Sequence, residues 1–182
     1  MNLERFEKQV AFILEADKEK NILRQTHLSG HGRRENDAEH AWHMAIMVYL
    51  LKEYSNNDID IAKTMMMALI HDIVEIDAGD TYAYDSEALK TQQQREQKAA
   101  ERIFGMLPDD QKEHLRSLFE EFEECKTPES KFARAMDNFQ PLILNNSNNG
   151  SDWREHNVTK AQVMKRQSLT ELGSKEIWEY TQ

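Results

Sequence analysis

Residues 65–80 read MMMALIHDIVEIDAGD, and this stretch decides the fold. It begins as an apolar helix core and then presents a series of acidic side chains, yet no Lys or Arg occurs between Lys63 and Lys90. Burying a carboxylate is costly unless a positive charge compensates it. The compensating charge must therefore come from a distant part of the chain or from a bound cation.

The composition around this stretch favours helices. The chain has 182 residues, enough for one domain with a sizeable core or for two very small ones. Glu, Lys, Gln, Leu, Ala and Met are plentiful, whereas there are only 6 Gly and 3 Pro. No run alternates apolar and polar residues in the manner of a strand. Because there is also no internal repeat and no linker-like boundary, we expect an all-α protein with a single domain over residues 1–182.

Charge and cysteine content restrict the partners and the compartment. A net charge of −10 argues against broad binding of nucleic acid, because a duplex requires a basic surface. Cys125 is the only cysteine, which excludes a disulfide framework and favours a reducing compartment. The N-terminal segment is charged and amphipathic rather than signal-like, and no apolar run approaches transmembrane length. These features predict a cytoplasmic protein that does not associate with membranes.

Apolar periodicity predicts where the helices lie. Phe6, Val10, Ile13 and Leu14 recur at helical spacing and predict an amphipathic first helix. Further helices are predicted over 38–54, 59–75 and 127–145. Two more lie between the last two of these and end at about Leu107 and about Cys125. A capping box of Thr159 and Gln162 predicts a final helix or two near the C-terminus. Residues 77–87 and 145–152 are predicted loops. We expect a core of about 24–140, on which C-terminal helices of about 153–182 pack.

The acidic stretch has the composition of a metal site. On a continuous helix His71 and Glu75 would share a face, with Asp72 about 100° round it. His40 begins the inward-facing stripe of the preceding helix, so it is a suitable further ligand. Histidines and carboxylates with coordination positions left for water favour Mn, Fe, Co, Ni or Zn over a structural zinc. The alternative is a packed core histidine beside a solvated acidic surface.

An ordered set of motifs resembles the HD-domain metal-dependent phosphohydrolases. That superfamily is marked by a histidine, a later His-Asp pair and a distant aspartate. Here these are His40 in RRENDAEHAWHMA, His71 and Asp72 in LIHDIVEIDAGD, and Asp137 in KFARAMDNFQPLIL. The resemblance implies a helical-bundle fold and one divalent transition metal held by these four residues. Asp137 becomes a candidate only through the resemblance, because periodicity places it beside the buried stripe of its helix.

The closer resemblance is to a small all-α branch that includes bacterial 5′-deoxynucleotidases and relatives of HD domain-containing protein 2. Its R-x-E-N-x-A-E-H and H-D-x-x-E-x-x-x-G-D motifs are matched at 33–40 and 71–80, and the similarity spans about 24–137. The resemblance implies release of phosphate from (deoxy)nucleoside 5′-monophosphates by a water that the metal activates. The implied partners are a small phosphorylated metabolite and a second copy of the chain in a homodimer.

The predicted hydrolysis gives roles to further residues, and among them the role of Asp80 rests on the resemblance. Glu75 would orient the attacking water or shuttle its proton. Asp80 would act at the substrate end, near the leaving 5′ oxygen or the sugar. A phosphomonoester dianion also needs cationic donors, a role that suits arginine, and Arg24 and Arg33 are the candidates.

Two details bear on the metal count and on the substrate. Family members with two metals have two further histidines between the His-Asp pair and the last aspartate, whereas only His114 lies there in this chain, so we predict one metal. Gln25 follows Arg24 where the branch has Trp, which bears on the choice of sugar. The alternatives are an HD-fold hydrolase of another phosphate ester or nucleotide polyphosphate, and a metal-binding scaffold without catalysis.

Overall fold

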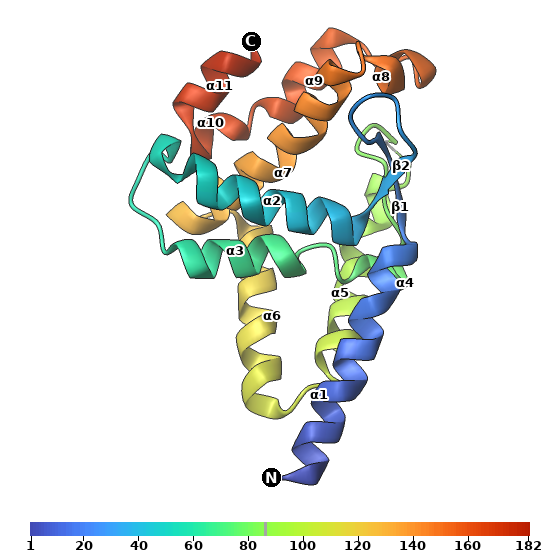
Figure 1. Ribbon diagram of the computed structural model, residues 1–182, viewed down its shortest axis with the longest axis vertical. Coiled ribbons are helices and arrows are strands. Elements are labelled where there is room, and N and C mark those ends of the chain that lie inside the picture. The colour runs from blue at the N-terminus through green and yellow to red at the C-terminus, as the bar shows by residue number, and fades with distance from the viewer. Residues whose placement is uncertain (86) are drawn as a thin grey trace.

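The structure is a computed structural model that describes residues 1–85 and 87–182. Nearly all of its regular structure is helical, which confirms the predicted all-α class, and the N-terminus and the C-terminal helices lie at opposite ends (Figure 1). The longer helices are α1 (Leu3–Ala16), α2 (Asp37–Leu51), α3 (Ile61–Ile70), α5 (Leu89–Phe104), α6 (Asp109–Glu124) and α7 (Pro128–Ser147). The shorter ones are α4 (Glu75–Ala78), α8 (Ser151–Glu155), α9 (Lys160–Gln167), α10 (Thr170–Gly173) and α11 (Lys175–Thr181).

Helices α2, α3 and α7 share one hydrophobic core. Met44 and Val48 of α2 pack there with Phe132 and Met136 of α7, and all four side chains are fully buried. Burying a side chain of this size contributes about 1.5–3 kcal/mol. Helix α7 begins with a capping box of Thr127 and Ser130. The three helices that carry or precede the predicted ligands are therefore held rigidly against one another.

A second apolar cluster joins α4, α5 and α6. Ile103 and Phe104 of α5 pack against Phe119 of α6, with Ile73 and Val74 from the turn before α4. Helix α1 lies alongside and contributes Phe12 and Ala16 to this cluster. The apolar residues that predict α1 do not belong to this cluster and are largely exposed; they are Phe6, Val10, Ile13 and Leu14.

The prediction that the chain lacks strands is wrong in one place. Strands β1 (Leu23–His27) and β2 (Arg34–Asn36) form an antiparallel hairpin with an irregular register. The turn uses positive φ values at Gly30 and His31, and the Leu28 N–H donates to the Arg33 carbonyl at 2.9 Å. The hairpin is short and polar, so it carries no alternating apolar pattern, and Arg24, Gln25 and Thr26 of β1 line a pocket.

The predicted helix over 59–75 ends sooner than its periodicity suggests. Helix α3 stops at Ile70, and tighter turns follow, in which the Glu75 N–H donates to the Asp72 carbonyl at 2.8 Å. The short α4 then ends at Gly79, whose φ of +74° suits glycine. His71 and Glu75 are therefore not on one continuous helix. Ser86, in the predicted loop 77–87, lies outside the described residues.

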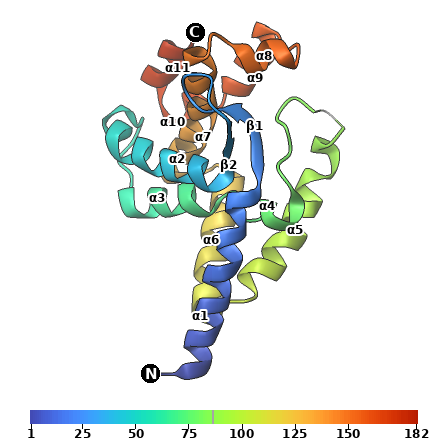
Figure 2. The same cartoon turned by 45° about the vertical axis from the view of Figure 1, so that its right-hand side comes forward.

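The C-terminal helices pack on α7. The predicted capping box of Thr159 and Gln162 is confirmed at the start of α9. Gly173 allows α10 to approach α7 closely, because a Cβ atom there would lie 2.3 Å from the Lys131 carbonyl oxygen. Figure 2 shows the segment that follows α4 rising beside the hairpin. Residues of these two segments line one pocket together with residues of α8 and α9. None of the helices in the described ranges is long and apolar enough to cross a membrane.

Candidate metal centre and adjoining pocket

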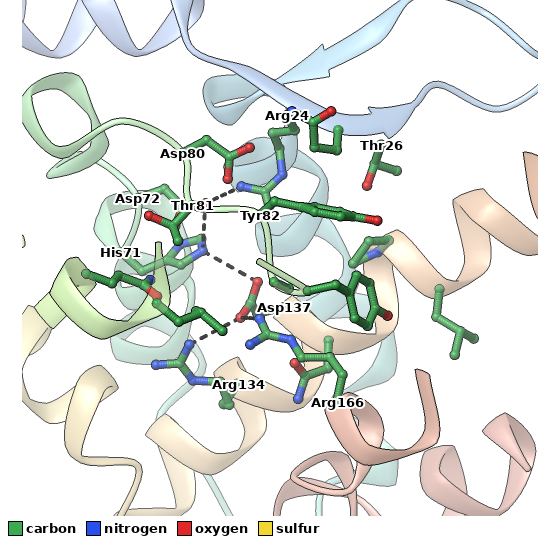
Figure 3. Close-up of a pocket in the computed structure, with 18 of the residues that line it drawn as sticks. Arg24, Thr26, His71, Asp72, Asp80, Thr81, Tyr82, Arg134, Asp137 and Arg166 are labelled. Carbon is green, nitrogen blue, oxygen red and sulfur yellow. Dashed lines mark hydrogen bonds and ion pairs between the residues drawn. The ribbon is translucent and has the colours of Figure 1, made fainter. Parts of the chain in front are cut away.

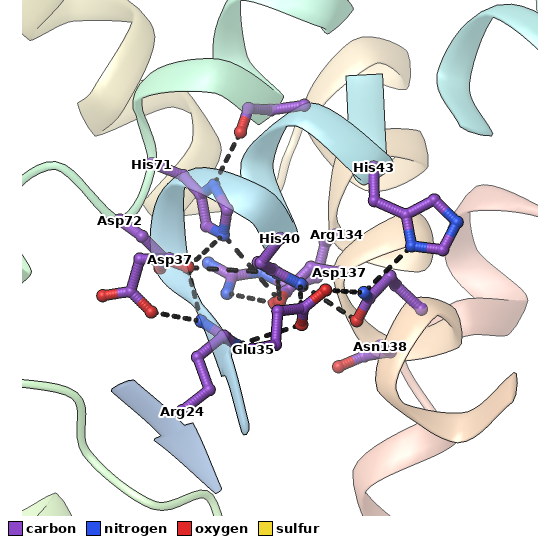
Figure 4. A network of polar contacts seen from close by, with 12 residues as sticks. Arg24, Glu35, Asp37, His40, His43, His71, Asp72, Arg134, Asp137 and Asn138 are labelled. Atoms are coloured by element: carbon purple, nitrogen blue, oxygen red, sulfur yellow. Dashed lines mark hydrogen bonds and ion pairs between the residues drawn. The ribbon is translucent and has the colours of Figure 1, made fainter. Parts of the chain in front are cut away.

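The structure brings together the four side chains predicted to bind a metal (Figure 4). The Nε2 atoms of His40 and His71 lie 3.3 and 3.8 Å from Oδ1 of Asp137. Oδ2 of Asp72 lies 3.9 Å from the His40 Nε2 atom and 3.0 Å from the His71 Nε2 atom. His40 comes from α2, His71 and Asp72 from the turn after α3, and Asp137 from α7.

Neighbouring acceptors fix the orientation of both imidazole rings. Nδ1 of His71 donates to the Ala68 carbonyl at 2.9 Å. Nδ1 of His40 lies 3.0 Å from Oε1 of Gln140, whose amide nitrogen donates to the buried Glu35 at 2.7 Å. With the protons held on Nδ1, both Nε2 lone pairs face the cluster. This is the arrangement that metal-binding histidines adopt.

One orphaned atom tests whether a metal fits this cluster. Nε2 of His71 is buried and makes no hydrogen bond of regular geometry within residues 1–85 and 87–182, although Oδ2 of Asp72 lies 3.0 Å away. Leaving such an acceptor unpaired is costly, so a native protein usually supplies a partner. Imidazole nitrogens and carboxylate oxygens together suit a divalent transition cation. The donor set therefore fits such an ion.

The acids around the cluster repel one another, and Arg24 offsets only part of this repulsion. Burial, reinforced by the carboxylates of Asp72 and Asp37, raises the pKa of Glu75 to about 12. Burial and Asp72 likewise raise the pKa of Asp37 to about 7. Burial also raises the pKa of Asp80, although the guanidinium of Arg24 opposes that shift. A divalent cation would relieve this repulsion.

Arg24 lies at the centre of this acidic group. Its Nη1 atom donates to Oδ2 of Asp72 at 2.7 Å and to Oδ1 of Asp37 at 3.1 Å. Its buried Nε atom has no hydrogen-bond acceptor in the described part of the chain. Arg24 belongs to strand β1 and lines the pocket beside Gln25. The hairpin therefore delivers the predicted phosphate-binding arginine to the cluster.

Arg33, predicted to bind the substrate, is not among the residues that line this pocket. Its side chain is exposed, and Nη1 donates to Oε2 of Glu39 and to the Arg34 carbonyl at 2.8 and 2.9 Å. Glu39 also completes the capping box of α2. The matched motif residue Arg33 therefore supports the start of a helix from the outer surface.

The pocket beside the cluster is lined by several elements (Figure 3). Glu75 and Asp80, the predicted catalytic residues, both lie on its wall. The hairpin, the segment after α4, and helices α5 to α9 contribute the rest. Its aromatic members are Tyr82, Tyr84, Phe122 and Trp153.

Two arginines at the pocket were missed from the sequence. Nη1 of Arg134 and Nη2 of Arg166 lie 3.3 and 3.4 Å from Oδ2 of Asp137, the oxygen turned away from the histidines. Arg134 precedes Asp137 by three residues, so helical spacing could have placed them on one face. Arg166 lies on α9 and has no local signal that connects it to the site.

Comparison with known proteins agrees with this architecture. A family model described as HD domain matches residues 16–178. The crystal structure of a predicted metal-dependent phosphohydrolase from Magnetospirillum magnetotacticum MS-1 is 46% identical, covers 98% of this chain and 89% of its own, and superposes with a TM-score of 0.93. A conserved hypothetical protein from Pyrococcus furiosus, 22% identical over 94% of this chain and 98% of its own, shows the same fold with a TM-score of 0.66.

Curated relatives match a smaller part of the chain. The 5'-deoxynucleotidase HDDC2 of Homo sapiens is 29% identical over 111 residues, which are 61% of this chain and 53% of that protein. The chain thus spans about half the length of such relatives. The family model nevertheless covers nearly the whole chain, and the Magnetospirillum structure matches it from end to end. The chain therefore belongs to the HD domain family.

Proposed function

We propose that this protein is a metal-dependent phosphohydrolase that releases phosphate from (deoxy)nucleoside 5′-monophosphates. The observation that carries the proposal is the buried cluster of two imidazoles and two carboxylates, which opens on a pocket lined by arginines. The names of the relatives support it, since one is a predicted metal-dependent phosphohydrolase and another a 5'-deoxynucleotidase.

His40, His71, Asp72 and Asp137 would hold one divalent transition ion, with Co, Mn, Fe, Ni and Zn as candidates. When bound, such an ion polarises a phosphoryl group and lowers the pKa of water. The contacts on Nδ1 orient both imidazoles so that their Nε2 atoms face the cluster. The carboxylate of Asp137 is held in place on its other oxygen by arginine.

Glu75 is placed to move the proton of the attacking water. It is buried beside the cluster, and its Oε2 atom has no hydrogen-bond partner in the parts of the chain that the structure describes. Burial, with the carboxylates of Asp72 and Asp37, raises its pKa, so it holds a proton more tightly than an exposed glutamate does. Asp80 lies on the pocket wall, where it would bind the leaving 5′ oxygen or the sugar.

Substrate contacts would come from both polar and aromatic walls. Arg24 would bind the phosphoryl group, and Gln25, next to it on the pocket wall, would meet the sugar. The rings of Tyr82 and Tyr84 meet edge to face with centroids 5.3 Å apart, near Trp153 on the same wall. Such rings offer faces on which a nucleobase could stack.

Phosphate release from ribo- and deoxyribonucleoside 5′-monophosphates, with Co²⁺ or Mn²⁺ added, tests the proposed function. The same panel should include nucleoside triphosphates and a simple aryl phosphate, which represent the alternative substrates. The ratio of ribo to deoxy rates reports what Gln25 does to sugar choice. If protein that is shown to hold metal releases no phosphate from any nucleotide, the nucleotidase assignment is wrong. The substrate would then be another phosphorylated compound.

We expect the metal to stabilise the folded chain. At about 100 times its dissociation constant, a ligand of the native state adds about 2.7 kcal/mol of stability. For a chain of this size that corresponds to a rise in Tm of about 5–10 °C. Thermal unfolding with Mn²⁺ or Co²⁺ measures it, and chelation should reverse it. An equal rise in His71→Ala would show that the ion binds elsewhere.

The homodimer also remains a prediction, and helix α2 offers a surface for it. Trp42, Ile46, Tyr49 and Leu50 form an exposed apolar stripe, in which Trp42 and Leu50 are 61% and 62% accessible. Residues 41–51 contain no charged side chain, so pairing the stripe with its own copy opposes no like charges. An exposed stripe of this kind is typical of an interaction surface.

Introducing a charge into this stripe should separate the copies. In Ile46→Glu we expect the dissociation constant of the dimer to rise at least about 100-fold, because two carboxylates would be buried at the centre. Light scattering after size-exclusion chromatography gives the mass. Leu169→Glu, at an exposed position outside this stripe, is the control. A monomeric wild-type protein, or a dimeric Ile46→Glu, would contradict this interface.

A further inference from the structure

Arg166 is the pocket arginine with the fewest acidic partners. It projects from α9 into the pocket (Figure 3), with 37% of its side chain accessible. Its one polar side-chain contact within the described ranges joins Nη2 to Oδ2 of Asp137 at 3.4 Å. Most of its five N–H donors are therefore available to a ligand.

Asp137 does not depend on this contact. Arg134 already lies 3.3 Å from the same carboxylate oxygen. Arg134 is itself held by Glu123, 2.8 Å away, and its guanidinium stacks 3.9 Å from the centre of the Phe122 ring. Arg134 is therefore a fixed support for Asp137, whereas Arg166 is free to turn toward a bound anion.

Arg24 differs from Arg166 in its charge balance. Asp72 and Asp37 both accept hydrogen bonds from Arg24, so two carboxylates offset its single charge. The acids nearest the cluster lie on this side, together with Glu75. A phosphoryl dianion that met Arg24 alone would find little net positive charge from the protein. The Asp137 side, with Arg134 and Arg166, is the more cationic one.

Buried neighbours on α9 fix the backbone position of Arg166, while its side chain can turn. Val163 and Gln167, on either side of it in sequence, are buried. The side-chain amide of Gln167 donates to the carbonyl of Asn138, next to Asp137 on α7, at 2.6 Å. This contact ties the helix turn that carries Arg166 to the helix turn that carries Asp137.

We propose that Arg166 binds a non-bridging oxygen of the substrate's phosphoryl group, from the side of the site opposite Arg24. Arg24 is bonded to Asp72 and Arg166 to Asp137, so a phosphoryl group over the cluster lies between the two guanidinium groups. Figure 3 shows Arg24 and Arg166 on opposite sides of His71 and Asp137. This inference rests on the proposed function, and it makes the C-terminal helices part of the substrate site.

Three variants test this contact. Arg166→Gln removes the charge, Arg166→Lys keeps it without the paired N–H groups, and Lys165→Gln removes an exposed neighbouring charge as the control. In Arg166→Gln we expect KM for the nucleotide and the inhibition constant of inorganic phosphate each to rise about 10- to 100-fold, the usual range for a hydrogen bond to a charged group. Arg166→Lys should recover part of the loss, and Lys165→Gln should match the wild type.

Binding experiments separate this inference from the proposed function. Calorimetry of inorganic phosphate with Mn²⁺-loaded protein needs no turnover, so it tests Arg166 even if no nucleotide is hydrolysed. Weaker phosphate binding in Arg166→Gln, with an unchanged Mn²⁺ affinity, supports the inference. Unchanged phosphate binding, no phosphate binding by the wild type, or a loss confined to Mn²⁺ affinity would each overturn it. The last result would show that Arg166 only supports Asp137.

Discussion

Replacing Asp72 with Asn is expected to reduce phosphohydrolase activity at least about 1,000-fold, because a bound metal contributes several kcal/mol of transition-state stabilisation. The amide has nearly the same shape but no charge, so it is a weaker ligand for a divalent ion. Oδ2 of Asp72 also lies 3.0 Å from Nε2 of His71 and 2.7 Å from Nη1 of Arg24. The change therefore removes the metal and misplaces Arg24 together.

Asp77→Asn is the matched control for this prediction. It makes the same chemical change five residues further on, where the carboxylate pairs with Arg102 outside the pocket. We expect its activity and metal content to equal those of the wild type. Metal content by mass spectrometry, with phosphate release at saturating substrate, measures both variants. A metal-replete, fully active Asp72→Asn would remove Asp72 from the ligand set.

Replacing Glu75 with Gln is expected to lower kcat by about 10²–10⁴-fold while the metal stays bound, since this is the usual contribution of a positioned proton carrier. The buried Oε2 atom lies beside the cluster with no partner among the described residues, and the glutamine amide keeps its volume but cannot take a proton. The measurement pairs kcat with metal content and with the Tm shift on adding Mn²⁺.

Glu75→Asp gives the conservative comparison. It keeps a carboxylate and shortens its reach, so we expect an intermediate kcat. Loss of metal from Glu75→Gln would instead show that Glu75 is a metal ligand. An unchanged kcat would show that Glu75 is not the proton carrier. Either result leaves Asp72 as a proposed metal ligand, because Asp72→Asn tests it independently.

The sequence alone was sufficient for the fold class and for the order of the motifs. Apolar spacing located most of the helices, and the scarcity of Gly and Pro favoured an all-α chain. The resemblance to HD-domain proteins rested on His40, His71, Asp72 and Asp137, and the family is confirmed. Local patterns carry this information because helix periodicity and motif spacing are properties of neighbouring residues.

Local patterns failed where distant segments decide the conformation. The hairpin at Leu23–Asn36 is polar, and its strands are stabilised by pairing with each other and by contact with α7 and α8. The end of α3 at Ile70 is likewise invisible to periodicity, because apolar residues continue through Ile73 and Val74 to fill a second core.

The roles of the arginines could be read only from the tertiary structure. Arg33 matches a motif yet pairs with Glu39 on the surface, whereas Arg24 reaches the cluster on a hairpin that the sequence did not predict. Arg166 is 29 residues from Asp137 along the chain and meets it because α9 packs on α7. A long, flexible cation carries no periodic signal of its own, so its partner depends on how the helices pack. The sequence thus determined the helical class and named the candidate ligands, and the packing of helices decided which charges surround them.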